Sequence, residues 1–181
     1  YPVGTYETRA YTKDLTKYSS EDRWGSEIDY FGTVLHSVTA GQSVRLDETG
    51  AEMTTGSYTT DAYNNIYGTL EKQVTIGVSY NRIWDEVAGD YTNYPVGTYE
   101  TRAYTKDLTK YASEDRWGSE IDYFGTVLHS VTAGKSVRLD ETGAEMTTGS
   151  YTTDAYNNIY GTLEKQVTVG VSYNRIWDEV A

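Results

Sequence analysis

Adjacent pairs of carboxylates are the first residues in this chain whose chemistry can be assessed. In the first half they are Glu21 with Asp22, Asp47 with Glu48, and Asp85 with Glu86. Two carboxylates can hydrolyse a glycosidic bond when they face it from about 5–10 Å apart. Neighbours in the sequence do not establish such a facing pair, because side chains on a strand alternate between its two faces. We therefore interpret the pairs as surface acids, assign no catalytic residue to them, and expect no enzyme.

Calcium is the second chemistry that these acids could support, since it binds carboxylate, carbonyl and amide oxygens. The segment that begins Asp47-Glu48 is loop-like and acidic, but it lacks the alternating Asp/Asn ligands of an EF-hand. Asp85, Glu86 and Asp90 form a second acidic group, just before the sequence of the first residues returns at Tyr94. We predict no obligatory cofactor, and we keep calcium as an option at these acids and their second-half counterparts. The candidate ligands are Asp47, Glu48, Asp85, Glu86, Asp90, Asp140 and Glu141.

His36, which returns as His129, is the only histidine in its half of the chain. A Ser-His-Asp relay needs a histidine beside a nucleophile, oriented by a carboxylate. His36 falls in a segment that we predict to be a strand, among apolar residues, which favours a packed structural role. The sequence also has no G-x-S-x-G elbow, P-loop or His-Glu-x-x-His pair. We predict no catalytic residue.

Aromatic residues offer the remaining route to a binding function. The chain has 19 tyrosines and four tryptophans. Exposed in a cluster, such side chains stack on sugar rings or anchor protein partners, whereas scattered exposed aromatics are normal on a sheet. The candidate ligand-binding residues, taken where tyrosine lies near arginine or asparagine, are Tyr11, Tyr63, Asn64, Tyr67, Tyr104, Tyr156, Asn157 and Tyr160.

The whole chain is one unit written twice. Residues 94–181 repeat residues 1–88 without a gap, with only the differences Ser19/Ala112, Gln42/Lys135 and Ile76/Val169. A cleft that divided its roles between the halves would need them to differ. Whatever one copy does is therefore done twice, or the length and valency of the array matter. We predict domains at 1–88 and 94–181 joined by a short linker at 89–93, and we expect the chain to be a piece of a longer array or a processed protein.

Charge and composition exclude several classes of partner. The net charge is −12, and phosphate binding needs clustered lysine and arginine. We therefore expect no nucleic-acid partner. The absence of cysteine excludes thiol chemistry and disulfides from the sequence. No apolar run approaches the ~18 residues of a membrane helix, so we expect no membrane insertion.

Alternation of apolar and polar residues predicts strands. The clearest covers 73–84, with Val74, Ile76, Val78 and Tyr80 directed toward a core. Further strands are predicted at 5–13, 28–38 and 43–47, and weaker ones at 54–62 and 67–73. Turn signals fall at 39–42, 47–50, 55–57 and 64–65, and Ser20 could cap a short helical turn. This spacing predicts an all-β fold, with two near-identical antiparallel β-sandwiches (Ig-like, or small barrels) arranged end to end.

The organisation, more than any motif, suggests a function. We expect structural repeat modules of a secreted or cell-surface protein, located outside the cell, on its surface or attached to its wall. The stalk or spacer of a microbial surface adhesin fits best, with neighbouring repeats as partners, and glycans or a host or cell-surface protein as further partners if the region is adhesive. The alternative is a tandem two-site carbohydrate-binding module that uses exposed tyrosine and tryptophan and gains avidity from its two sites.

Overall fold

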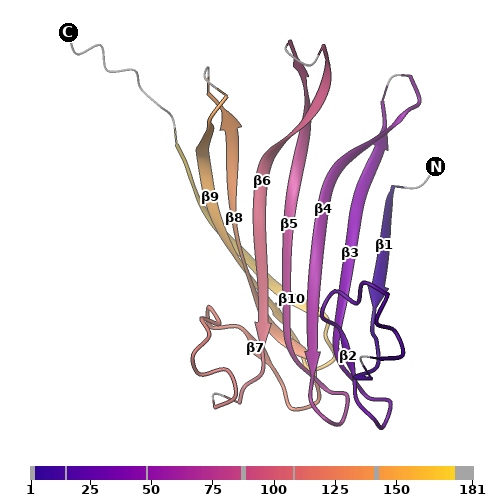
Figure 1. Ribbon diagram of the computed structural model, residues 1–181. Helices are drawn as coiled ribbons and strands as arrows, with labels where there is room; N and C mark the ends of the chain where they lie inside the picture. Colours follow the sequence, from indigo (N-terminus) through magenta and orange to yellow (C-terminus); the bar gives the residue numbers. More distant parts are fainter. Residues whose placement is uncertain are drawn as a thin grey trace.

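The computed structural model describes residues 3–14, 16–47, 49–86, 89–107, 109–140 and 143–173. These residues form strands, turns and loops and no helix, so the prediction of an all-β chain is confirmed. The strands belong to one open antiparallel sheet (Figure 1). The prediction of two β-sandwiches arranged end to end is not confirmed, because strands from both copies lie in this single sheet.

Each copy contributes four main strands and one short one. The bounds in the first copy are β1 (Gly4–Arg9), β2 (Glu27–Ile28), β3 (Val34–Leu46), β4 (Glu52–Asn64) and β5 (Leu70–Asp85). In the second copy they are β6 (Asp90–Tyr104), β7 (Glu120–Ile121), β8 (Val127–Leu139), β9 (Glu145–Asn157) and β10 (Leu163–Ser172). The order across the sheet is β1-β3-β4-β5-β6-β8-β9-β10, while β2 and β7 pair with β3 and β8.

The two copies meet in a long hairpin. Strand β5 pairs with β6 from Asp85 opposite Asp90 to Lys72 opposite Tyr104. The predicted linker at 89–93 is therefore part of this hairpin: Gly89, with φ of 66°, precedes β6, and residues 90–93 are its first residues. Whether each copy also folds alone remains a prediction.

Two predicted turns are wrong, and one reason is visible at a glycine. Residues 39–42 lie inside β3 and residues 55–57 inside β4. Gly41 does not turn the chain; a Cβ there would lie 2.4 Å from the ring of Tyr58, which packs over it. The turns at 47–50 and 64–65 are confirmed, with Gly50 and Gly68 at positive φ. The helical turn expected after Ser20 is wrong, because residue 21 is a bend and residues 22–23 are irregular.

Regular rows of side chains cross the sheet. One row alternates tyrosine and glycine, in the order Tyr6, Gly41, Tyr58, Gly77, Tyr99, Gly134, Tyr151 and Gly170. The next row on the same face holds Thr8, Thr39, Thr60, Thr75, Thr101, Thr132, Thr153 and Thr168. Threonine hydroxyls in the pairs 8/39, 60/75, 101/132 and 153/168 lie 2.8 Å apart. Both rows cross from β5 to β6 without interruption, so the sheet continues through the boundary between the copies.

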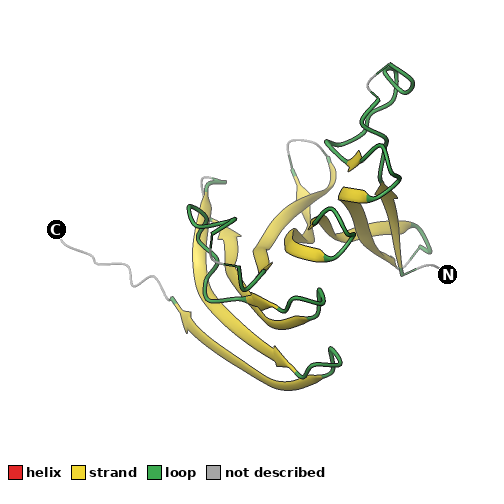
Figure 2. Ribbon diagram, turned by 90° about the horizontal axis from the view of Figure 1, so that it is seen from below, coloured by secondary structure: helices red, strands yellow, loops and turns green. Residues whose placement is uncertain are grey.

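The sheet has little covering its faces. It curls as a single layer (Figure 2), and the buried apolar residues are Val38, Ala103, Tyr104, Ile121 and Val131. The expectation that Ile76 lines a core is wrong, because its side chain is 55% exposed. The fold therefore leaves apolar surface that a compact domain would bury.

Candidate functional site

Lys72 on β5 occupies a polar and aromatic site at the boundary between the copies. Its Nζ lies 2.5 Å from Oε2 of Glu114 and within 5.1–5.5 Å of the ring centres of Tyr63, Tyr104 and Tyr111. Only 16% of the Lys72 side chain is exposed. An ammonium held over tyrosine faces and beside a carboxylate gains both cation–π and ion-pair energy. We call these five residues the junction cage.

The second copy supplies three residues of the junction cage from one strand and its following loop. Tyr104 ends β6, and the loop after it returns to bring Tyr111 edge-on to Tyr104, with ring centres 5.6 Å apart. The Tyr104 hydroxyl donates to Glu114 at 2.8 Å. Beside the cage, Lys110 pairs with Glu71 across the same boundary, and the Thr105 amide donates to the Glu71 carbonyl at 2.6 Å.

The electrostatics of the junction cage follow from these contacts. Partial burial opposes ionisation of Glu114, but hydrogen bonds from Lys72 and Tyr104 outweigh it and lower the pKa of Glu114 below its usual value. Burial, and then the hydrogen bond to Glu114, raise the pKa of Tyr104. Glu114 is therefore ionised at neutral pH, and its contact with Lys72 links the second copy to the first.

A second recurring feature is a tryptophan that packs on an arginine. Trp24 has φ of 51°, and its ring centre lies 3.8 Å from Cζ of Arg9. Trp117 repeats this geometry, with φ of 53° and a distance of 3.9 Å to Arg102. A positive φ in a bulky residue is uncommon and costs energy, so the surrounding contacts must hold it in place.

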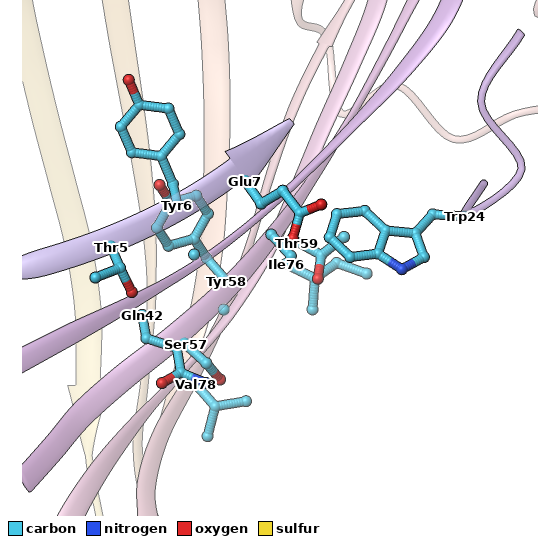
Figure 3. Close-up of a pocket in the computed structure, with 13 residues that line it drawn as sticks. Thr5, Tyr6, Glu7, Trp24, Gln42, Ser57, Tyr58, Thr59, Ile76 and Val78 are labelled. Carbon is cyan, nitrogen blue, oxygen red and sulfur yellow. The ribbon is translucent and has the colours of Figure 1, made fainter. Parts of the chain in front are cut away.

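Each tryptophan borders an open hollow on the sheet. In the first copy, Trp24 lines a hollow of about 720 Å³ with Glu7, Thr59 and Ile76 (Figure 3). In the second copy, Trp117 lines a corresponding hollow. The walls combine apolar side chains with hydroxyl and carboxylate groups, which is the mixture that binds polar ligands with an apolar face.

His36 is held by three contacts. Its Nδ1 lies 2.9 Å from the Gly25 carbonyl oxygen, its Nε2 lies 2.8 Å from Oδ1 of Asp61, and its ring stacks on Tyr63 with centres 4.0 Å apart. These contacts join the loop before β2 to the sheet. His129 repeats the arrangement, with a distance of 2.8 Å to Asp154.

The structure divides the candidate ligand-binding residues between three environments. Tyr63 and Tyr104 meet in the junction cage, while Tyr67 and Tyr160 stand 84% exposed at turns of the sheet. The others have contacts within their own copy. Tyr11 donates to Glu21 at 2.6 Å, Asn64 to the Val34 carbonyl at 2.9 Å and Asn157 to the Val127 carbonyl at 2.9 Å, and Tyr156 stacks on His129.

Sequence reasoning missed Lys72, Tyr111 and Glu114. Lys72 and Glu114 are 42 positions apart and belong to different copies, so no local pattern joins them. The only sequence signal for this contact is the near-identity of the copies, because the last strand of one copy can then pair with the first strand of the next.

Among the candidate metal ligands, Asp47 is engaged in its own turn. Its Oδ1 accepts hydrogen bonds from the Thr49 hydroxyl at 2.7 Å, the Ala51 amide at 3.0 Å and the Thr49 amide at 2.8 Å, and its Oδ2 pairs with Arg82 at 3.0 Å. These bonds, that of the Thr49 hydroxyl first, lower the pKa of Asp47 to about 2.

The remaining metal candidates do not form a cluster in the part of the chain that the structure describes. Asp90 accepts from the Tyr91 amide at 2.6 Å and Asp140 from the Ala144 amide at 3.0 Å, and Glu86 follows the end of β5. Glu48, Glu141 and the side chain of Asp85 lie outside the described residues. No group of three or more histidine, cysteine or acidic residues able to hold a metal ion occurs among the residues described. A calcium site remains a prediction.

Comparisons of the chain with protein-family models, with curated proteins and with solved structures found no match. A search of the described residues for a helix long and apolar enough to span a membrane also found none.

Proposed function

We propose that this chain is a structural repeat segment in which each copy adds strands to one continuing sheet, and that it forms a stalk or spacer of a secreted or cell-surface protein. The observation that carries the proposal is the pairing of β5 with β6, which extends the tyrosine–glycine and threonine rows across the copy boundary. The near-identity of the copies agrees with it, because a spacer is selected for length rather than for differences between its units. The proposal assigns the chain no catalytic step.

The proposed array lengthens across the strands of one sheet, whereas separate domains joined by linkers would be arranged end to end. Strands of one sheet lie about 4.8 Å apart, so four added strands extend the sheet by ~19 Å per copy, measured across the strands. The junction cage supplies the attachment at each boundary, together with the backbone hydrogen bonds of the β5–β6 ladder. Copy number then sets the length of the spacer, and the curl of the sheet sets its path.

A series of chains with two, three and four copies tests this function. Small-angle scattering at low protein concentration should show the contour of the particle growing by a constant ~19 Å per added copy. In amide exchange measurements, the amides of β5 and β6 should be as strongly protected as those of β3 and β4. Increments of a full domain diameter, with rapid exchange along 85–93, would instead indicate separate domains joined by a linker and would contradict the proposal.

The alternative of a two-site carbohydrate-binding module is favoured by the two tryptophan hollows. Both have a half-buried tryptophan beside hydroxyl groups, and the same hollow occurs at the same place in each copy. A glycan-array screen of the chain tests it, with the double variant Trp24→Ala/Trp117→Ala as the control. Binding that is lost in the double variant would establish this function beside the structural one.

A further inference from the structure

We propose that β10 of one chain docks against β1 of a second copy of this chain and thereby repeats the junction found between β5 and β6. This inference rests on the proposed function, and it extends that function from one chain to an assembly of chains. The docked copies would share one sheet, with Thr168 opposite Thr8, Val169 opposite Glu7 and Gly170 opposite Tyr6, as their counterparts are paired inside the chain.

The two outer edges of the described sheet are copies of the two edges that meet inside it. Strand β1 has the sequence of residues 97–102 in β6, and β10 has that of residues 70–79 in β5 except for Val169 in place of Ile76. Inside the chain these edges form the β5–β6 ladder. At the ends, β1 and β10 each have a strand partner on one side only among the described residues. An edge strand with unpaired backbone groups is a template for another strand.

The tyrosine–glycine row leaves complementary shapes at the two edges. Inside the chain the Tyr99 ring covers Gly77 so closely that a Cβ there would lie 2.2 Å from it. At one edge, Tyr6 is 76% exposed. At the other edge, the atoms nearest to a Cβ on Gly170 are the Ser150 carbonyl oxygen at 3.0 Å and the Cβ of Tyr151 at 3.3 Å, and no ring covers it. Tyr6 of a second copy would cover Gly170 as Tyr99 covers Gly77.

The junction cage is also present in two halves. At the β1 edge, Tyr11 and Tyr18 lie edge-to-face with ring centres 5.7 Å apart, and Tyr11 donates to Glu21 at 2.6 Å. This is the arrangement that Tyr104, Tyr111 and Glu114 adopt around Lys72. At the β10 edge, Lys165 lies 5.3 Å from the ring centre of Tyr156, as Lys72 lies 5.1 Å from that of Tyr63. Each edge therefore holds the part of the cage that the other lacks.

Charge and surface area support a second copy as the occupant. Glu164 and Lys17, on opposite edges, are the counterparts of the paired residues Glu71 and Lys110. All ten residues of β10 are exposed, including Val167, Val169 and Val171. Docking would cover them as β6 covers β5. Because the contact is head-to-tail, each chain of a docked pair keeps one unpaired edge strand. Further chains can therefore add in series to form a filament, or the chains can close into a ring.

The first test compares two single-lysine variants of the full chain by sedimentation velocity over a range of concentrations. The unmodified chain is expected to form dimers and larger species as its concentration rises. Lys165→Gln should weaken this association about tenfold or more, because it leaves Glu21 without its cation. Lys135→Gln, which removes the same charge and restores the residue of the first copy, should have no effect. A chain that stays monomeric at every concentration, or equal effects of the two variants, would overturn the proposal.

The second test fixes the register, using a chain that has no cysteine of its own. With Glu7→Cys and Val169→Cys, mild oxidation should link separate chains into a ladder of dimers and larger species on a non-reducing gel. The matched control, Thr8→Cys with Val169→Cys, places the thiols on opposite faces of the sheet and should not cross-link. A disulfide formed within one chain, or equal cross-linking by both pairs, would overturn the proposed contact.

The two proposals can fail separately. Protected β5 and β6 amides in a chain that never associates would leave the structural function standing and remove only the docking of copies. Rapid exchange along 85–93 would contradict the continuous sheet itself, whatever the state of association.

Discussion

The two copies have almost the same sequence but different surroundings. Tyr104 is 3% exposed and Ile121 is fully buried, whereas their counterparts Tyr11 and Ile28 are only half-buried. None of the three sequence differences lies at these positions. What differs is the neighbour, since β5 lies beside β6 and no described strand lies on the outer side of β1. Tyr104 and Ile121 are therefore buried because of the contact between the copies, and not because of the sequence of either copy alone.

At the β10 edge the second copy is the more exposed of the two. Residues 70–75 of β5 are half-buried because β6 covers them, whereas their counterparts in β10 are all exposed. Lys72 is enclosed in the junction cage, and Lys165 lies over one tyrosine ring at an open edge. Each copy is thus stabilised at the one boundary that it shares, the first through β5 and the second through β6, as expected where neighbouring repeats contribute interface energy.

The largest expected effect comes from removing a buried ring. Tyr104→Ala should destabilise the chain by about 3–5 kcal/mol, because it empties a buried aromatic position. Tyr11→Ala, the same substitution at the same place in the first copy, should cost about 1 kcal/mol or less, as at a partly exposed site. Urea unfolding of both variants at low protein concentration measures the difference. Similar costs would mean that burial of Tyr104 does not depend on the neighbouring copy.

A smaller effect is expected from the two lysines. Lys72→Met should destabilise by about 1–3 kcal/mol, since Glu114 would keep its tyrosine hydrogen bond but lose its charged partner. Lys165→Met should change stability by less than about 0.5 kcal/mol in a dilute, unassociated chain, because it lies at an exposed position. Thermal unfolding of the two variants under identical conditions compares them. Greater destabilisation by Lys165→Met would refute the assignment of the cage to the internal boundary.

Alternation located strand segments in the sequence because it reports which residues share a face, but it did not give their bounds. The separate strands predicted at 28–38 and 43–47 are wrong, since residues 34–46 form the single strand β3 and residues 30–32 form a turn. The segment predicted at 73–84 lies in β5, and the acidic turn at 47–50 forms where Asp47 and Gly50 suggested. Glycine was misleading at Gly41, where it makes room for the Tyr58 ring inside a strand. A glycine signals either a turn or a close approach, and the choice depends on a partner strand that local sequence does not specify.

Strand pairing between the copies could not be predicted for a related reason. Alternation does not say which strand lies beside which, so the same pattern suits two sandwiches or one extended sheet. The β5–β6 ladder and the pairing of Lys72 with Glu114 depend on that choice. The individual tyrosines were identifiable as candidates, but the gathering of Tyr63 and Tyr104 around one lysine needed the sheet order.

The smallest expected effect is a pH dependence confined to the junction cage. The pKa of Glu114 lies below its usual value of 4.5 in the folded chain, so ionised Glu114 favours the folded form. This stabilisation by ionised Glu114 is complete above the usual pKa of 4.5, and it is lost as the pH falls through the lowered pKa of the folded chain. Protection of the Thr105 amide, which donates to Glu71 across the boundary, should therefore decrease as the pH falls below about 4.5.

The control for this titration is Lys72→Met. Without the ammonium, one hydrogen bond and one charge that lower the Glu114 pKa are removed, so its titration should move toward the usual value. The acid-dependent loss of Thr105 protection should then begin at the same pH but be complete at a higher pH and be smaller in extent, while protection in β3 and β4 stays the same in both chains. Protection factors from amide exchange, corrected for the intrinsic effect of pH, give the comparison. Identical pH profiles in the two chains would show that the cage does not set the acid stability of the boundary between the copies.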